Sequence, residues 1–235
     1  MQAICKSIIS QNYILRDALI VIQSTLANKR LSKEERGDLG ELAVLYTLLA
    51  LQQQYQGIMK VYHSVLLKKP NSDWTTEIDF IVVTPFAIFV IETKSYYGHT
   101  TILKNHKFNV KNEHYTKEYD VVYQNQGHCQ TLYKLIYPYL SSPQVIRPVV
   151  TIFSVGTLTD TRDTSSRNQY PVLNVQYLLT YIGSIIKRGL DSHLNPNVNL
   201  PKCIEQINKY NIQSEDEMTS HIRRIQKRYK TGGFP

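Results

Sequence analysis

Two apolar segments separated by a short turn constrain the fold of this 235-residue chain more than any other feature. Residues 77–83 and 88–93 are rich in Val, Ile and Phe, which favour strands, and residues 84–87 (Thr-Pro-Phe-Ala) are typical of a tight turn. A third segment of similar composition, residues 58–67, precedes them. The sequence therefore predicts three consecutive strands, with the last two paired as a hairpin.

The predicted hairpin carries charged residues within its apolar strands. If the turn is symmetric about its middle bond, residues whose numbers sum to 171 face each other. Asp79 and Glu92 satisfy this sum, and strand alternation places Lys94 and Glu77 on the same face. Like charges in direct opposition are destabilising, so the pair predicts a compensating cation, for which a hard divalent metal ion is the natural candidate.

The residue types around this pair suit phosphodiester chemistry. Carboxylates such as Asp79 and Glu92, with a strand carbonyl such as that of Thr93, are oxygen ligands that magnesium or manganese prefers. Such a metal would lower the pKa of a bound water and neutralise charge on a scissile phosphate. Lys94 would orient or deprotonate the attacking water, or stabilise the developing charge.

Apolar residues at helical spacing predict helices before the strands. An N-terminal amphipathic helix is predicted from residues at intervals of four, three and four: Leu15, Leu19, Ile22 and Leu26. A second helix is predicted over residues 34–54, with an apolar stripe of Leu39, Leu42, Tyr46 and Leu49. On a neighbouring face, Gly37 and Gly40 would let the backbone approach another element closely and hold Glu41 against it.

The rest of the chain is predicted to combine strands and helices. Further strands are expected over residues 100–103, 108–110, 148–153 and 172–175, and helices over 121–140 and 176–188. The polar segment 159–169 is predicted to be an exposed loop, followed later by a Pro/Asn-rich connection. A final helix is predicted to begin at Ser214, which forms a capping box with Glu217.

Composition and missing motifs limit the partners, the compartment and the activities that we expect of this chain. The chain has 27 Lys and Arg against 19 Asp and Glu, a net charge of +8, which favours a polyanionic partner such as nucleic acid. Cys5, Cys129 and Cys203 are far apart and form no CxxC pair, so we expect neither disulfides nor a zinc site, and a reducing cytoplasm. No signal peptide is indicated, and no segment reaches the roughly 20 apolar residues of a membrane-spanning helix. A nucleotide loop of the GxxxxGK(S/T) type is absent, so unwinding of nucleic acid would need a separate partner.

The order of several short motifs resembles the nuclease-related domain (NERD) family, which is placed within the PD-(D/E)xK nuclease superfamily. These motifs are Gly37-x-x-Gly40-Glu41, Thr76-Glu77-Ile78-Asp79, Val90-Ile91-Glu92-Thr93-Lys94, Gly98 and Gln124-Asn125-x-x-His128. The resemblance covers roughly residues 35–153, about half the chain. It implies a restriction-endonuclease-like α/β core, with a mixed central β-sheet flanked by helices and the acids on its central hairpin.

The resemblance also implies roles for individual residues. Glu41 would be the helix acid that assists the metal, Asp79 and Glu92 the metal ligands, Lys94 the catalytic lysine and Gln124 a catalytic residue on the later helix. His128, one helical turn further, is expected to reach the substrate phosphate, and we also assign Lys104 and Lys107 to substrate binding. Two positions depart from the family pattern: Ala87 replaces the usual glycine of the turn, and residues 120–123 lack the usual Asn-Pro.

These observations lead to one preferred function and two alternatives. We predict an N-terminal helical extension (1–34), a nuclease core (35–155) and a C-terminal strand and helix extension (156–235). The expected activity is that of a cytoplasmic deoxyribonuclease that depends on Mg²⁺ (or Mn²⁺). The sequence does not distinguish DNA from RNA as the substrate. A homodimer and a separate helicase or other DNA-processing partner are compatible with this function. A non-catalytic nucleic-acid-binding protein of the same fold is the main alternative, and a two-carboxylate hydrolase such as a glycosidase is the third.

Each candidate residue also has a structural explanation. Asp79 and Glu92 could be edge-strand charges that discourage aggregation, and Lys94 could simply form a salt bridge to Glu77. Glu41 could be a solvated helix residue. The predicted N-terminal helix could mediate dimerisation or cover the sheet.

Overall fold

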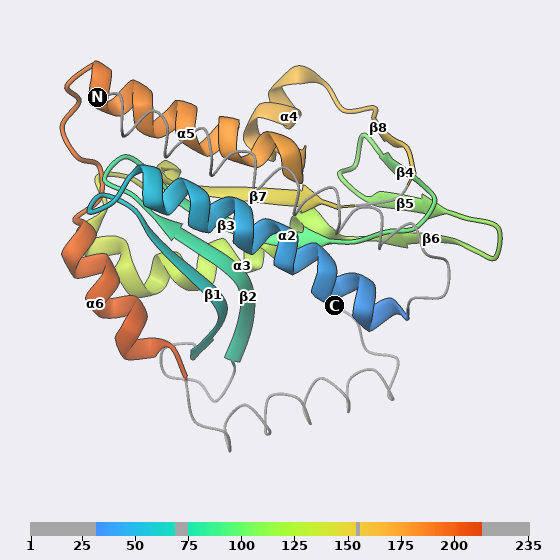
Figure 1. Cartoon of the computed structure of the whole chain (residues 1–235), viewed down its shortest axis with the longest axis horizontal. Helices are drawn as coiled ribbons and strands as arrows, with labels where there is room; N and C mark the ends of the chain where they lie inside the picture. Colours follow the sequence, from blue (N-terminus) through green and yellow to red (C-terminus); the bar gives the residue numbers. More distant parts are fainter. Residues whose placement is uncertain (1–31, 69–74, 154–155, 213–235) are drawn as a thin grey trace.

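The computed structural model describes residues 32–68, 75–153 and 156–212 (Figure 1). The predicted N-terminal helix, the predicted final helix and most of the loop before the second strand lie outside these residues. The described chain is an α/β fold with two β-sheets flanked by helices. This confirms the predicted restriction-endonuclease-like fold class.

The larger sheet has five strands in the order β1-β2-β3-β7-β9. Their bounds are β1 (Lys60–Lys68), β2 (Thr75–Val83), β3 (Ile88–Lys94), β7 (Ile146–Ile152) and β9 (Val172–Asn174). The first three strands are antiparallel, whereas β3, β7 and β9 are mutually parallel. A parallel neighbour requires a crossover connection, and most of the chain between β3 and β7 supplies it.

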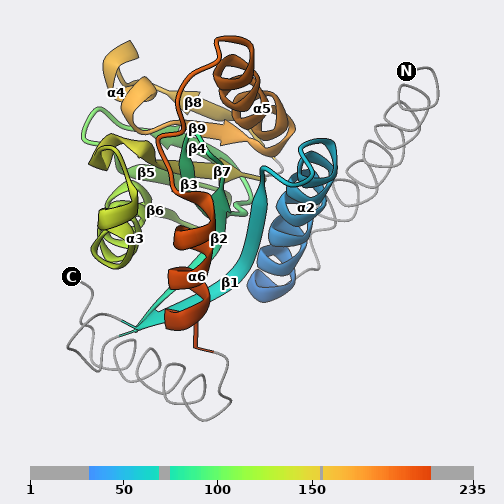
Figure 2. The ribbon, with the colours of Figure 1, turned by 90° about the vertical axis from the view of Figure 1, so that its left-hand side faces the viewer.

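Helices cover both faces of the larger sheet (Figure 2). On one face lie α2 (Lys33–Gln54) and α5 (Val175–Asp191), and on the other lie α3 (Val121–Ile136) and α6 (Leu200–Tyr210). The predicted helix over 121–140 ends earlier, and short 3-10 turns follow at Tyr137–Tyr139 and Pro143–Val145. Helix α6 forms within the expected Pro/Asn-rich connection and was not predicted.

Strands β2 and β3 form the predicted hairpin in the predicted register. Four opposed pairs, beginning with Phe80 and Ile91, have residue numbers that sum to 171. Thr84 closes the turn, because its hydroxyl donates to the Ala87 carbonyl oxygen (2.7 Å) and accepts from the Ala87 N–H (3.0 Å). The ladder stops at Phe80 and Ile91, one position before the two acids.

In both β1 and β2, the alternation of side chains between the two faces of the sheet is interrupted at one residue. Their ladder is interrupted at Ser64 and Asp79, while the pairs on either side keep one register. Ser64 has a φ of 50°, a left-handed conformation that is uncommon for residues other than glycine. Beyond the break, Ile78 lies on the α3 side, as Ile81 does, although the two residues are three positions apart and regular alternation would put them on opposite faces. Glu77 therefore lies on the face opposite Glu92 and Lys94, which contradicts the alternation expected from the sequence.

Helix α2 buries a different face from the predicted one. The residues that it buries are Gly40, Ala43, Val44, Thr47, Leu48 and Leu51. Three residues of the predicted stripe, Leu42, Tyr46 and Leu49, keep 37%, 45% and 44% of their surface exposed. The prediction was wrong because this helix has apolar residues on two faces, and only packing against the sheet selects one of them.

A smaller sheet in the order β6-β5-β4-β8 lies beside the larger one (Figure 1). Its strands are β4 (His99–Ile102), β5 (Phe108–Lys111), β6 (Thr116–Tyr119) and β8 (Leu158–Asp160). Strand β6 was not predicted, and β8 and helix α4 (Thr164–Gln169) occupy the segment predicted to be an exposed loop. Arg162 in this segment is only 1% exposed, and its Nε and Nη2 atoms donate to Asp160 at 2.9 and 2.7 Å. Because this ion pair compensates the charge of Arg162, the arginine can be buried although its segment is polar.

The segments beyond residue 155 contribute to both sheets, through β8 and β9. The division of the chain into three segments stays a prediction. Cys129 and Cys203 are free thiols. None of the helices in the described ranges combines the length and the apolar character that a membrane crossing requires.

Gly98→Ala is expected to destabilise the smaller sheet. Gly98 has a φ of 111°, and a Cβ at this position would lie 2.4 Å from the Lys111 carbonyl oxygen. Because the obstacle is backbone, we expect a loss of about 2–4 kcal/mol in the free energy of unfolding, measured by urea denaturation. Gly127→Ala in α3, where a Cβ meets nothing within 4 Å, is the control and should not destabilise the protein. Equal stability of the two variants would contradict this prediction.

Candidate active site

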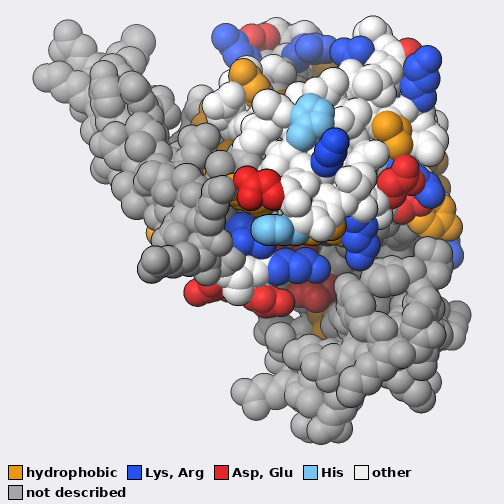
Figure 3. All heavy atoms as spheres, turned by 90° about the vertical axis from the view of Figure 1, so that its right-hand side faces the viewer, with side chains coloured by type: hydrophobic (Ala, Val, Ile, Leu, Met, Phe, Trp, Pro, Cys, Tyr) orange, Lys and Arg blue, Asp and Glu red, His pale blue; other side chains and the backbone are white. Residues whose placement is uncertain are grey.

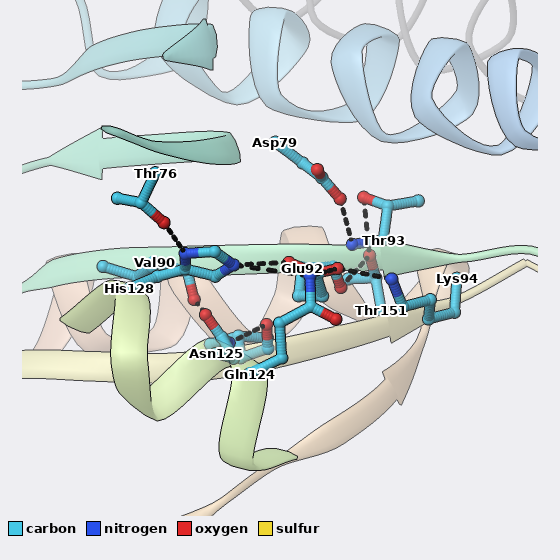
Figure 4. Close-up of polar contacts among 11 residues, drawn as sticks. Thr76, Asp79, Val90, Glu92, Thr93, Lys94, Gln124, Asn125, His128 and Thr151 are labelled. Carbon is cyan, nitrogen blue, oxygen red and sulfur yellow. Dashed lines mark hydrogen bonds and ion pairs between the residues drawn. The ribbon is translucent and has the colours of Figure 1, made fainter. Parts of the chain in front are cut away.

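The two candidate acids lie where β2 and β3 stop pairing (Figure 4). Asp79 Oδ2 accepts a hydrogen bond from the Thr93 N–H at 2.6 Å, so the carboxylate takes the place of a main-chain partner. The N–H and C=O groups of one strand residue point to the same edge, so the Thr93 carbonyl is also directed toward β2. Asp79 and the Thr93 carbonyl therefore share the gap between the two strands.

Glu92 is 2% exposed and receives donors from two elements. Lys94 Nζ donates to Glu92 Oε1 at 2.5 Å, and Gln124 Nε2 from α3 donates to the same oxygen at 2.8 Å. The other oxygen, Oε2, lies 3.3 Å from His128 Nε2, but no described residue gives it a well-aligned hydrogen bond. Figure 4 shows these side chains of β3 and α3 gathered around one carboxylate.

His128 links three elements of the site. Its side chain is buried, with Nε2 near Glu92 on β3 and Nδ1 2.9 Å from Thr76 Oγ1 on β2. If Nε2 carries the proton toward Glu92, the Thr76 hydroxyl donates to Nδ1. The structure thus places His128 against Glu92 inside the protein, whereas the sequence assigned it to a substrate phosphate.

Asn125 fixes α3 to the sheet. Its side chain is fully buried, and Nδ2 donates to the carbonyl oxygens of Val90 (3.1 Å) and Val149 (2.9 Å). These carbonyls belong to β3 and β7, so one amide ties both strands to the helix that carries Gln124 and His128. The roles of Asn125 and Thr76 were missed. Both residues belong to the motifs that resemble the family, and this was the only indication in the sequence that they have a role in the site.

Glu41 approaches the site from α2. A Cβ at Gly40 would lie 3.2 Å from Ser95 Cβ, so the helix comes close to the end of β3, as predicted. Gly37 does not share this role, since a Cβ there would meet nothing within 4 Å. Glu41 Oε2 lies 3.3 Å from His63 Nε2 on β1, and the Glu41 charge contributes to the raised pKa of Asp79.

The two hairpin acids have opposite pKa shifts. Burial, and then the neighbouring charge of Glu92, raise the pKa of Asp79 well above its usual value, although the Thr93 N–H and Lys94 oppose them. Burial also raises the pKa of Glu92, but Lys94 and His128 together outweigh it, so the pKa is lowered. Glu92 is therefore the acid held in its ionised form, and Asp79 is the one that retains a proton more readily.

The carboxylates of Asp79 and Glu92 repel each other, and a hard cation between them would compensate their charges. Within residues 32–68, 75–153 and 156–212, no three His, Cys, Asp or Glu side chains form a group that could hold a metal ion. Glu92 is instead paired with Lys94, and Glu41 lies beside His63. However, Glu92 Oε2 lacks a hydrogen bond, and Asp79 is destabilised as an anion next to it. A cation between these two carboxylates would relieve both conditions.

Lys104 and Lys107 lie in the connection between β4 and β5. Lys107 Nζ is 3.9 Å from Glu118 Oε2, and Lys104 is exposed. In the part of the chain that the structure describes, neither lysine is ion-paired with the hairpin acids. Figure 3 shows a face of the molecule on which lysine and arginine side chains are interspersed with acidic ones. Substrate binding by these two lysines stays a prediction.

The mixed sheets and flanking helices define a protein of the restriction-endonuclease-like class. The pattern of the Nuclease-related domain (NERD) family matches residues 36–154, just over half of the chain, and the chain belongs to this family. This confirms the resemblance found in its motifs.

Comparison with solved structures gives two similar proteins. Protein VC1899 from Vibrio cholerae is 13% identical, with 65% of this chain and 33% of that chain covered and a TM-score of 0.40. The chain thus spans about a third of the length of that protein. Protein AF1548, of unknown function, is 10% identical, with 81% and 98% covered and a TM-score of 0.34. Comparison with curated proteins found no match.

Proposed function

We propose that this protein is a divalent-metal-dependent nuclease that hydrolyses phosphodiester bonds of DNA. The observation that carries the proposal is the buried carboxylate of Glu92, with Lys94 Nζ 2.5 Å away and Asp79 close enough to shift in pKa. These residues lie in the segment that matches the family. The net charge of +8 is also favourable for binding a polyanion.

Asp79, Glu92 and the Thr93 carbonyl would hold Mg²⁺ or Mn²⁺, with Glu41 assisting from α2. Such an ion, when bound, would lower the pKa of a water molecule and neutralise phosphate charge. A glycosidase is less well supported, because a compact ammonium group beside two acids suits a phosphate substrate.

The protein side chains supply positioning and charge. The Lys94 side chain is 25% exposed, so its ammonium can reach a substrate while it contacts Glu92. It would orient the attacking water or offset charge on the phosphate. Gln124 holds Oε1 of Glu92, and His128 stands against Oε2, so α3 keeps the carboxylate in one orientation.

The test is cleavage of plasmid and linear DNA with and without Mg²⁺ or Mn²⁺. The natural chain is expected to cut only with metal, and Asp79→Ala is expected to be inactive. Glu205→Gln, which removes an exposed acid on α6 paired with Lys202, is the matched control and should cut normally. Retention of DNA without cutting by the natural chain would refute the proposal and favour a binding protein. An RNA substrate assayed in parallel decides between the two nucleic acids.

Thr76→Val and His128→Asn are expected to weaken the response to metal. Both variants disrupt the Thr76–His128–Glu92 contacts, so Glu92 Oε2 should lose its orientation. We expect the Mg²⁺ concentration for half-maximal cleavage to rise about tenfold, as for other residues that orient metal ligands. His128→Gln, whose amide can reach the position of Nε2, should restore part of the response.

DNA binding without metal separates this role from substrate contact. Fluorescence anisotropy with labelled DNA in EDTA should give equal affinities for the natural chain, Thr76→Val and His128→Asn. If His128 binds the phosphate, as the sequence suggested, His128→Asn will bind DNA more weakly in EDTA and Thr76→Val will not.

A further inference from the structure

Three tyrosine side chains lie together beside the candidate acids. Tyr96 comes two residues after Lys94 at the end of β3, and its ring centroid lies 5.3 Å from that of Tyr119 on β6. Burial raises the pKa of Tyr96, and the neighbouring groups of Tyr119 and Glu92 raise it further. Tyr115, between β5 and β6, also acts on Tyr96 and is a hydrogen-bond partner of Tyr119. The tyrosine cluster of Tyr96, Tyr115 and Tyr119 therefore adjoins the Glu92 carboxylate.

The tyrosine cluster extends from the interior to the surface. Tyr96 packs in the core, with its ring centroid 6.4 Å from that of Phe108. Its hydroxyl oxygen is buried, and no described residue gives it a hydrogen bond. Tyr119 is partly buried, whereas Tyr115 keeps 45% of its surface exposed. A ligand bound at the acids can therefore reach the ring of Tyr115.

The turn between β5 and β6 holds Tyr115 by its main chain (Figure 1). The Asn112 N–H donates to the Tyr115 carbonyl oxygen at 3.0 Å, and Asn112 Oδ1 accepts from the Tyr115 N–H at 3.0 Å. The two strands form a regular antiparallel ladder up to this turn. Because these bonds do not involve the ring, the turn fixes the position of Tyr115 without needing its side chain.

Lys117 adds a positive charge to the same hairpin. Its side chain is exposed, and Nζ lies 5.2 Å from the ring centroid of Tyr119. Exposed aromatic rings with neighbouring cations suit a single nucleic-acid strand, because the rings stack on bases and the cations contact phosphates. In a duplex, each base face is already stacked on its neighbours, so a tyrosine ring can stack only on an unpaired or terminal base. The arrangement therefore favours an unpaired strand.

We propose that the tyrosine cluster binds an unpaired nucleic-acid strand beside the acids, with one base stacked on Tyr115 and a backbone phosphate at Lys117. The inference rests on the proposed function for the nature of the ligand. It adds the form of the substrate, which is a single strand or the unpaired part of a duplex. Tyr96 and Tyr119 support the outer ring from below, since they lie between it and the core.

Fluorescence anisotropy in EDTA tests the proposal with one labelled DNA oligonucleotide, used as a single strand and as a duplex with its complement. Tyr115→Ala is expected to weaken single-strand binding at least about fivefold and to leave duplex binding nearly unchanged. Tyr115→Phe keeps the ring and should bind both DNAs like the natural chain. Tyr137→Ala is the matched control, because Tyr137 is 57% exposed and follows the other end of α3, roughly 20 Å along the helix from Gln124.

Three results would overturn the proposal. One is single-strand binding by Tyr115→Ala as tight as that of the natural chain. Another is an equal loss of single-strand and duplex binding in this variant, because the contact is then with the backbone and not with a base. The third is a loss in Tyr115→Phe as large as in Tyr115→Ala, because the hydroxyl and not the ring then makes the contact.

The nuclease proposal is tested separately, because binding in EDTA requires neither metal nor catalysis. Metal-dependent cleavage by the natural chain, together with normal single-strand binding by Tyr115→Ala, would refute only this inference. Single-strand binding that depends on the Tyr115 ring, without cleavage under any metal condition, would refute only the nuclease activity.

Discussion

Asp79→Asn is expected to abolish metal-dependent cleavage and, at the same time, to raise the thermal stability of the metal-free protein. Cleavage should fall by at least about a thousandfold, because the variant loses a charged metal ligand. The gain in stability follows from the raised pKa of Asp79, which shows that burial and Glu92 disfavour its anion. Asparagine can still accept the Thr93 N–H without carrying that charge.

The pH dependence of this gain has a definite sign. A carboxyl whose pKa is raised by folding adds stability below its unfolded pKa, and that contribution is lost as the pH rises through the folded value. The stabilising effect of Asp79→Asn should therefore be present at neutral pH and disappear in acid. We expect about 1 kcal/mol, or a few degrees in Tm, from calorimetry in EDTA. A variant that melts below the natural chain at neutral pH would contradict this assignment.

Glu92→Gln is expected to be equally inactive but less stable. The lowered pKa of Glu92 means that its anion is favoured in the folded protein, through Lys94 and His128. Such a carboxylate contributes stability above its unfolded pKa, and that stability is lost as the pH falls through the folded value. Glutamine cannot offset the Lys94 ammonium, so we expect a loss of about 1–3 kcal/mol at neutral pH.

Urea denaturation in EDTA measures this loss, with Glu205→Gln as the matched control for removal of an exposed acid. The alternative that these acids are edge-strand charges is wrong, because β2 and β3 are interior strands of the larger sheet. Opposite signs for the two hairpin variants are the decisive pattern, because solvated charges without a role in the site would change stability little in either case. A Glu92→Gln protein as stable as the control would show that Lys94 and His128 do not favour the Glu92 anion.

Local pattern determined the central hairpin and the identity of its acids. Strand composition, a four-residue turn and period-two alternation are short-range properties, and they placed Phe80 opposite Ile91 in the observed register. The motifs around Asp79, Glu92 and Lys94 were also enough to indicate the family that the comparisons confirm. None of these conclusions required knowledge of contacts between distant segments.

Only the tertiary structure decided the surroundings of the acids. The break at Ser64 and Asp79 reverses the strand faces, so alternation could not place Glu77 correctly. Thr76, Gln124 and His128 come to Glu92 from different elements, and no sequence spacing encodes that meeting.

Tertiary packing also decided which side chains are buried. Helix α2 has apolar residues on two faces, and the sheet with α5 selects one of them. Arg162 is buried because Asp160 pairs with it, although its segment is polar. The physical reason is common to all of these cases: periodicity is a property of one segment, whereas burial and pairing depend on which other segment occupies the adjacent space.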